Sequence, residues 1–157
     1  MDGRVLIFAP RGRDASIAAD LLARNAIETY ICTHQDCLLD ELSAGAEVVL
    51  VTEEALARGL PKVAAWVASQ EAWSDVPFVV LSNGSSSPRT STAGRRLSEL
   101  GNVVLLERPM HTEALLGAVR SALRARMRQY ELRDALARLQ GAASIVEPPL
   151  AMPILMD

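Results

Sequence analysis

The chain has 157 residues, with 50% hydrophobic and 22% charged residues and a formal net charge of −3. This composition suits one α/β domain with a hydrophobic core and some additional chain. No apolar run approaches the roughly 20 residues of a membrane helix, and residues 1–4 lack the layout of a signal peptide. A charge this near neutral gives no general attraction to nucleic acid. Two cysteines without a secretory signal indicate a reducing, cytoplasmic location.

Short apolar runs alternate with segments of helical periodicity. Runs rich in Val, Ile and Leu predict strands at residues 4–8, 27–32, 48–51, 76–81 and 103–106. Helices are predicted at residues 17–24, 36–43, 92–100 and 113–140, with a further helical region after residue 54 that Gly59-Leu60-Pro61 interrupts. Asp14 or Ser16 is suited to cap the first helix, whose predicted buried face carries Ile17, Leu21 and Leu22.

The alternation of strand and helix predicts a parallel sheet covered by helices on both faces. The 103–106 strand, a continuous apolar run, is predicted to be fully buried. The flavodoxin-like strand order 2-1-3-4-5 is the natural arrangement, with ligands bound outside the carboxyl ends of the strands. We therefore expect a flavodoxin-like (βα)5 domain followed by an extended C-terminal helix.

Two apolar stripes run along the last helix. The first comprises Leu116, Val119, Leu123, Met127 and Tyr130, and the second, offset from it, comprises Leu132, Leu136 and Leu139. A helix of about 30 residues is about 45 Å long, so we expect it to project beyond the domain from about Arg126. An apolar stripe on a projecting helix needs a partner, which predicts a dimeric coiled coil or a signalling helix to an output domain. The alternative is a helix that folds back onto its own domain.

Three parts of the chain are therefore expected. Residues 1–125 form the domain, residues 126–140 form the projecting helix, and residues 141–157 form a flexible or partner-ordered tail. Three prolines and no charge pattern mark the tail, although its end is apolar.

The Val76-Pro77-Phe78-Val79-Val80-Leu81-Ser82 segment, the Arg108-Pro109 turn and the final helix carry a family resemblance. From about residue 4 to about residue 125, the chain resembles the response-regulator receiver domains of two-component signalling. It looks especially like degenerate receivers, or pseudo-receivers, at the N-terminus of sensor histidine kinases. The resemblance implies the receiver fold and a role in phosphorelay-type signal transduction.

Receiver chemistry uses an acidic pair that holds Mg²⁺, a phosphoacceptor aspartate, a Ser or Thr, and a lysine that binds the phosphoryl oxygens. The positions that match these roles here are Ala9-Pro10, Thr52 (or Glu53 if the alignment shifts by one residue), Ser82 and Arg108. Neither Ala9 nor Pro10 can bind a cation through its side chain. The resemblance therefore implies a degenerate pocket with no phosphoacceptor aspartate.

Charged residues on the same loops suggest what fills this pocket. We expect Arg108 to pair with Glu53 or Glu54, because the planar guanidinium favours a bidentate carboxylate pair. A glutamate there resembles a phosphorylated aspartate in charge, which would hold the domain in one signalling state. Arg11, Arg13 and Arg89 are possible contacts for a small anion, although solvated loops are the favoured interpretation.

Other chemistries have little support in the sequence. Cys32, His34 and Cys37 do not have the spacing of a zinc site, and no second cysteine pair completes four ligands. There is no phosphate-binding glycine motif. We therefore expect a non-enzymatic module without metal or cofactor.

The resulting functional hypothesis is a pseudo-receiver that acts by protein contacts. Its expected partner is a second copy, through the helix that carries Leu123, Met127 and Tyr130 and the second stripe, or a sensor histidine kinase or output domain. The first alternative is a phosphoaccepting response regulator that uses Glu53 or Thr52. The second is a nucleic-acid-binding regulator that uses the arginines of the last helix, which are Arg120, Arg124, Arg126, Arg128, Arg133 and Arg138.

Overall fold

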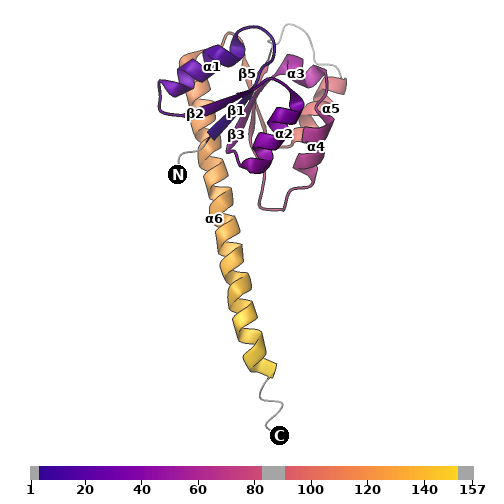
Figure 1. Cartoon of the computed structure of the whole chain (residues 1–157), viewed down its shortest axis with the longest axis vertical. Helices are drawn as coiled ribbons and strands as arrows, with labels where there is room; N and C mark the ends of the chain where they lie inside the picture. Colours follow the sequence, from indigo (N-terminus) through magenta and orange to yellow (C-terminus); the bar gives the residue numbers. More distant parts are fainter. Residues whose placement is uncertain (1–3, 83–90, 152–157) are drawn as a thin grey trace.

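A computed structural model describes the backbone of residues 4–82 and 91–151 and the side chains of residues 4–82 and 94–141. The strands are β1 (Arg4–Phe8), β2 (Glu28–Cys32), β3 (Val48–Thr52), β4 (Phe78–Ser82) and β5 (Val103–Glu107). The helices are α1 (Asp14–Ala23), α2 (Gln35–Ala44), α3 (Glu53–Ala57), α4 (Pro61–Ala68), α5 (Ser91–Leu100) and α6 (Thr112–Ala151). The strands form one parallel sheet in the order β2-β1-β3-β4-β5 (Figure 1). The predicted fold class and strand order are therefore confirmed.

The sheet separates two apolar cores, because successive side chains along a strand point to opposite faces. On β3, Val49 and Val51 face α2, α3, α4 and α5, whereas Val48 and Leu50 face α1 and α6. All five residues of β3 and of β4 are buried. The interruption at Gly59-Leu60-Pro61 is also confirmed: α3 ends at Ala57, Gly59 has a φ of +88°, and α4 begins at Pro61. Among the described helices, none is long and apolar enough to cross a membrane.

The prediction that residues 103–106 form a fully buried strand is wrong. β5 is an edge strand, and its residues Val104 and Leu105 are 43% and 41% exposed. A continuous apolar run indicates burial on both faces only where helices cover both faces. At the edge of this sheet α5 and α6 cover β5 incompletely, which the sequence of the strand itself does not reveal.

The predicted start and cap of the first helix are also wrong. α1 begins three residues earlier than expected, at Asp14, and the residue before it, Arg13, makes no capping side-chain hydrogen bond. The Ser16 hydroxyl donates to the Arg13 carbonyl oxygen at 3.1 Å. With this start, Ala18 and Leu22 are buried, whereas Ile17 is 44% exposed.

α6 differs from its prediction at both its packing face and its end. Leu116 and Val119 of the predicted stripe are buried, together with Leu115, which the prediction omitted. Met127 is 43% exposed, because the helix has turned it away from the sheet by that point. The helix continues past Gln140 to Ala151, so its predicted end is wrong; residues 152–157 of the predicted tail lie outside the described residues. In Figure 1, α6 extends far beyond the sheet.

A group of stacked side chains holds α6 against the loop that precedes β4. We call this group the α6 clamp, and it consists of Trp73, Arg126, Tyr130 and Arg133. The ring centroids of Trp73 and Tyr130 lie 5.8 Å apart. The Arg126 guanidinium carbon lies 4.7 Å from the Tyr130 centroid and 5.6 Å from the Trp73 centroid. Arg133 makes the same two contacts at 4.9 and 5.6 Å. Each such cation–π contact contributes about 0.5–2 kcal/mol.

Hydrogen bonds connect this clamp to the loop before β4. Arg126, which is only 4% exposed, donates to the Ser74 hydroxyl at 2.9 Å and to Gln129 Oε1 at 2.6 Å. Gln129 also pairs with the backbone of Asp75, accepting from its N–H and donating to its carbonyl oxygen. Contacts with the folded domain therefore continue along α6 to Arg133, beyond the predicted boundary at residue 125.

Replacement of Arg126 tests this clamp. We expect Arg126→Ala to lower the free energy of unfolding by about 2–4 kcal/mol, because it removes two cation–π contacts, two hydrogen bonds and buried volume. Arg126→Met should restore part of the loss by filling the volume. The control Arg128→Ala removes an exposed arginine of the same helix and should cost less than about 0.5 kcal/mol. Urea unfolding at one fixed protein concentration measures all three, and equal losses in the two alanine variants would contradict the clamp.

Candidate functional site

The carboxyl edge of the sheet brings together the residues that the sequence placed in a degenerate pocket. The pairing of Thr52 with Leu81 and of Ser82 with Glu107 aligns the ends of β3, β4 and β5. The Arg108 N–H donates to the Ser82 carbonyl oxygen at 3.1 Å, which extends the ladder by one residue. Thr52, Ser82 and Arg108 therefore meet at one edge.

Thr52 has a structural role at this edge. It is 3% exposed, and its Oγ1 accepts a hydrogen bond from the Ala55 N–H at 3.3 Å. This is an N-cap bond that satisfies one unpaired amide in the first turn of α3. The same turn carries Glu53 and Glu54, where the positive end of the helix dipole favours negative charge.

Arg108 is the centre of the charge arrangement. Its guanidinium donates to both carboxylate oxygens of Glu54, at 2.9 and 2.8 Å, and to Asp14 Oδ2 at 2.7 Å. The predicted pair of Arg108 with a glutamate of this turn is therefore present and involves Glu54. Asp14 was predicted to cap α1; instead its carboxylate binds Arg108, because α1 starts at Asp14 itself and places that side chain at the sheet edge.

Burial and ion pairing act in opposite directions on Arg108. The hydrogen bonds that the guanidinium donates to Glu54 and Asp14 raise its pKa above the ordinary value, whereas burial lowers the pKa by a smaller amount. The arginine therefore stays charged at every physiological pH. One permanent cation is bonded to two carboxylates that come from α1 and α3, and it connects both helices to the end of β5.

The positions of the acidic pair cannot bind a metal ion. Ala9 is buried and Pro10 is exposed, and neither side chain carries a donor atom. The cavity between Pro10, Thr52 and Glu54 has a volume of only about 10 Å³, which is room for about one water molecule. Within the described part of the chain, no group of three or more His, Cys, Asp or Glu side chains is placed to hold a metal ion.

The other predicted site residues do not converge on this cavity as a group. Arg11 contributes to its lining, Arg13 is exposed, and Arg89 lies outside the described residues. His34 is the N-cap of α2, with its Nδ1 accepting from the Cys37 N–H at 3.2 Å. This capping role accounts for the histidine between the two cysteines, and no metal ion is needed to explain it.

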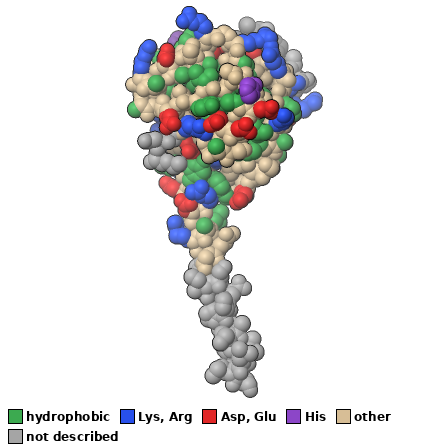
Figure 2. All heavy atoms as spheres, viewed as in Figure 1, with side chains coloured by type: hydrophobic (Ala, Val, Ile, Leu, Met, Phe, Trp, Pro, Cys, Tyr) green, Lys and Arg blue, Asp and Glu red, His purple; other side chains and the backbone are tan. Residues whose placement is uncertain are grey.

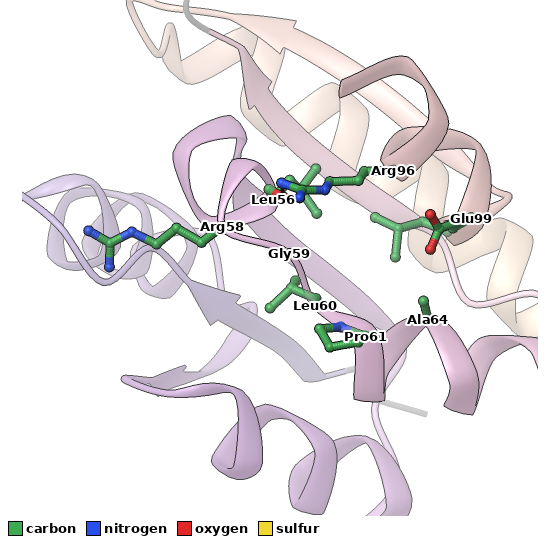
Figure 3. A pocket seen from close by; sticks show the side chains of 9 residues that line it. Leu56, Arg58, Gly59, Leu60, Pro61, Ala64, Arg96 and Glu99 are labelled. Atoms are coloured by element: carbon green, nitrogen blue, oxygen red, sulfur yellow. Dashed lines mark hydrogen bonds between the residues drawn. The ribbon is translucent and has the colours of Figure 1, made fainter. Parts of the chain in front are cut away.

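A larger cavity of about 270 Å³ lies between the α3–α4 link and α5 (Figure 3). Arg96 donates to the carbonyl oxygens of Leu56 and Ala57, which are the last acceptors of α3. Arg96 therefore caps the C-terminus of α3, and Thr52 caps its N-terminus. The contacts of Arg96 with α3 had no signal in the sequence.

No protein-family model and no curated protein matches the sequence. Solved structures do match. The chain is similar to NtrX from Brucella abortus, with a TM-score of 0.66 and 18% identity over 86% of this chain and 29% of that one. It is also similar to the signal receiver domain of a two-component histidine kinase from Clostridium thermocellum, with a TM-score of 0.58 and 11% identity over 78% of this chain and 98% of that one.

A third similar structure contains a yeast Spc42 trimeric coiled-coil segment fused to another structure. The TM-score is 0.61 and the identity 19%, over 97% of both chains. Sequence identities this low are no evidence of a shared function, but the topology of this chain agrees with that of the three structures. The chain has the CheY-like receiver fold of response regulators, with a long C-terminal helix.

Replacement of Arg108 tests the ion-pair arrangement. We expect Arg108→Ala to lower the free energy of unfolding by about 1–2 kcal/mol, a range reduced because all three side chains are partly exposed to water. Arg108→Lys should lose part of this stability, because lysine cannot make the planar bidentate contact. In double-mutant cycles, the coupling of Arg108 with Glu54→Gln should exceed that with Asp14→Asn, since only Glu54 is held by two parallel bonds.

The matched control is Arg11→Ala, an exposed arginine at the same edge, which should change stability by less than about 0.5 kcal/mol. Equal effects of Arg108→Ala and Arg11→Ala would contradict the structural role of the pair.

Proposed function

We propose that this chain is a non-enzymatic regulatory module of two-component signalling, a pseudo-receiver that acts through protein contacts rather than through its own phosphorylation. The observation that carries the proposal is the occupation of the phosphoacceptor edge by the bonded group Arg108, Glu54 and Asp14. The receiver fold of the neighbours supports the signalling role, and the chemistry at this edge argues against phosphoryl transfer.

Two features of the edge disfavour a working phosphoacceptor. Phosphoryl transfer to a receiver needs Mg²⁺ held by oxygen ligands, and Ala9-Pro10 offers no side-chain oxygen. The Thr52 hydroxyl is buried and engaged in capping α3. Phosphorylation of Thr52 would therefore require this edge to open, and Glu53, which is partly exposed, has no metal-binding side chain at Ala9-Pro10.

The Arg108–Glu54 pair suggests how the module is held in one state. In receivers, the basic residue after the last strand binds the oxygens of the phosphoryl group, and here the arginine at that position binds two carboxylate oxygens. In this proposal the Glu54 carboxylate supplies from within the chain the negative charge that a phosphoryl group would bring to the arginine. We infer a domain with a fixed signalling state, which does not depend on a phosphodonor.

Labelling with acetyl phosphate tests this part of the proposal. After incubation with acetyl phosphate and Mg²⁺, we expect the intact mass of the chain to be unchanged, because the edge holds neither a metal site nor an acceptor aspartate. A conventional receiver domain treated in the same tube is the positive control. Incorporation of phosphate into this chain that is lost in Glu53→Gln or Thr52→Val would overturn the proposal in favour of the phosphoaccepting alternative.

We further propose that α6 joins two copies of the chain in a parallel coiled coil. Leu132, Leu136 and Leu139 are 50%, 41% and 67% exposed and follow the four- and three-residue spacing of a coiled-coil seam. α6 has 40 residues and is about 60 Å long. Leu136 and Leu139 lie beyond the clamp residue Arg133, and Leu132, beside the clamp, is exposed. The fused coiled-coil chain, similar over nearly its whole length, supports such an arrangement of domain and helix.

The clamp explains where the seam begins. Gln129 occupies the seam position before Leu132, but its side chain is bonded to the backbone of Asp75. The domain therefore uses the helix as far as Arg133 on one face, and the second copy would use the face that starts at Leu132. A sensor histidine kinase is the proposed protein with which such a dimer acts, since the Clostridium thermocellum neighbour is described as belonging to one.

The nucleic-acid alternative has less support in the contacts of the helix arginines. Arg126 is buried, and Arg133 stacks on the clamp rings and pairs with Asp134 at 3.0 Å. On the face drawn in Figure 2, basic and acidic side chains are intermixed. On this face the basic side chains do not form the continuous positive surface that phosphate binding favours.

Substitution of the seam tests self-association without disturbing the clamp. We expect light scattering to give twice the chain mass for the wild type and the mass of one chain for Leu132→Ser/Leu136→Ser/Leu139→Ser, because the polar residues remove the apolar contact between helices. Met127→Ser, an exposed apolar residue outside the seam, is the control and should stay dimeric. A wild-type monomer, or a triple variant that remains dimeric, would contradict the coiled coil.

A further inference from the structure

The two cysteines lie on either side of the turn that joins β2 to α2. Cys32 is the last residue of β2 and is 1% exposed, while Cys37, in the first turn of α2, is half-buried. Cys37 packs against the core cluster that contains Cys32. Burial and, after it, the neighbouring Cys37 thiol raise the pKa of the Cys32 thiol. Both are free thiols. The fold thus brings together the only two cysteines of the sequence.

The surroundings of the two thiols differ in a way that orders their reactivity. Cys37 is partly accessible to solvent, whereas Cys32 is enclosed in the core. Burial raises the pKa of the Cys32 thiol to about 12, so it stays protonated behind Cys37. An oxidant from solution therefore meets Cys37 first.

We propose that Cys32 and Cys37 form a reversible intramolecular disulfide when the protein meets a hydroperoxide. The Cys37 thiolate attacks one peroxide oxygen, the O–O bond breaks, and a sulfenic acid forms as hydroxide or alkoxide leaves. The Cys32 sulfur then attacks the Cys37 sulfur, the S–O bond breaks, and water leaves with the Cys32 proton. The two thiols are oxidised by two electrons and the peroxide is reduced. A cellular dithiol returns the pair to its reduced form.

The turn that would carry the bridge also positions α4. Leu60 precedes α4 without a capping side chain of its own, and Gln35 from α2 takes that role. Gln35 Oε1 accepts from the N–H groups of Lys62 and Val63 at 3.0 and 3.4 Å, and Lys62 pairs with Asp36 at 2.9 Å. A bridge at Cys37 pulls the first turn of α2 toward β2 and loosens this contact. The proposal therefore includes faster hydrogen exchange of the Val63 amide in the oxidised protein.

Peroxide treatment of the reduced full-length chain tests the disulfide. We expect the wild type to lose two hydrogen atoms in its intact mass and to resist alkylation at both cysteines until a reductant is added. In Cys32→Ser, Cys37 should stop at a sulfenic acid that dimedone traps. In Cys37→Ser, the buried Cys32 should stay unmodified.

Three results would overturn the disulfide: two alkylatable thiols in the treated wild type, oxidation of Cys37 to sulfinic acid as the main product, or covalent dimers in place of the internal bridge. Exchange of the Val63 amide is then compared between reduced and oxidised wild type, with peroxide-treated Cys37→Ser as the control. Unchanged exchange in an oxidised, bridged wild type would overturn the coupling of the bridge to α4.

Discussion

The Arg108 guanidinium determines how the charged side chains are arranged at the carboxyl edge of the sheet. Asp14 and Glu54 come from helices that lie apart in the sequence, and both point their carboxylates at the end of β5. Without a cation between them, the two carboxylates would repel each other. Arg108 makes the arrangement stable in its charged form and leaves little space beside it. A site built in this way is closed by its own side chains rather than left open for a substrate.

The same segment connects that edge to the projecting helix. Arg108 precedes the start of α6 by four residues, and the helix then runs along the sheet to the clamp at the opposite end of the strands. α6 is therefore fixed at two ends of the domain, by the ion pair near its start and by Arg126 in the clamp. Beyond Arg133 no described contact of the domain restrains it.

The order of the strands and helices could be predicted from the sequence, but only some of the contacts between them could. Alternating apolar runs and helical segments were sufficient for the strand order, because few topologies satisfy parallel pairing with short connections. The Arg108–Glu54 pair could be predicted for a related reason, because the carboxyl ends of the strands in one parallel sheet lie at the same edge. Asp14 was misassigned because an acidic residue before an apolar segment has the same pattern whether it caps a helix or turns toward a distant cation.

Arg126 marks the limit of such predictions. An arginine among many on a basic helix gives no local sign of burial, since burial depends on Trp73 and Ser74, which lie more than fifty residues away in the chain. The exposure of β5 is a similar case. An apolar strand has the same sequence pattern at the edge and in the centre of a sheet, so the pattern alone does not predict how far it is buried. Both errors concern the surroundings that distant segments provide, and neither concerns the type of element formed.

Position 52 shows how the structural requirement of this fold differs from the chemical requirement of phosphorylation. The residue there ends β3 and at the same time caps α3, so the fold asks only for a side-chain oxygen that accepts from the Ala55 N–H. Aspartate, asparagine, serine and threonine all meet that requirement, whereas phosphorylation requires the aspartate carboxylate and its metal ion. Threonine meets the structural requirement and has no carboxylate. At the same edge, the carboxylate of Glu54 is bonded to Arg108 by two parallel hydrogen bonds.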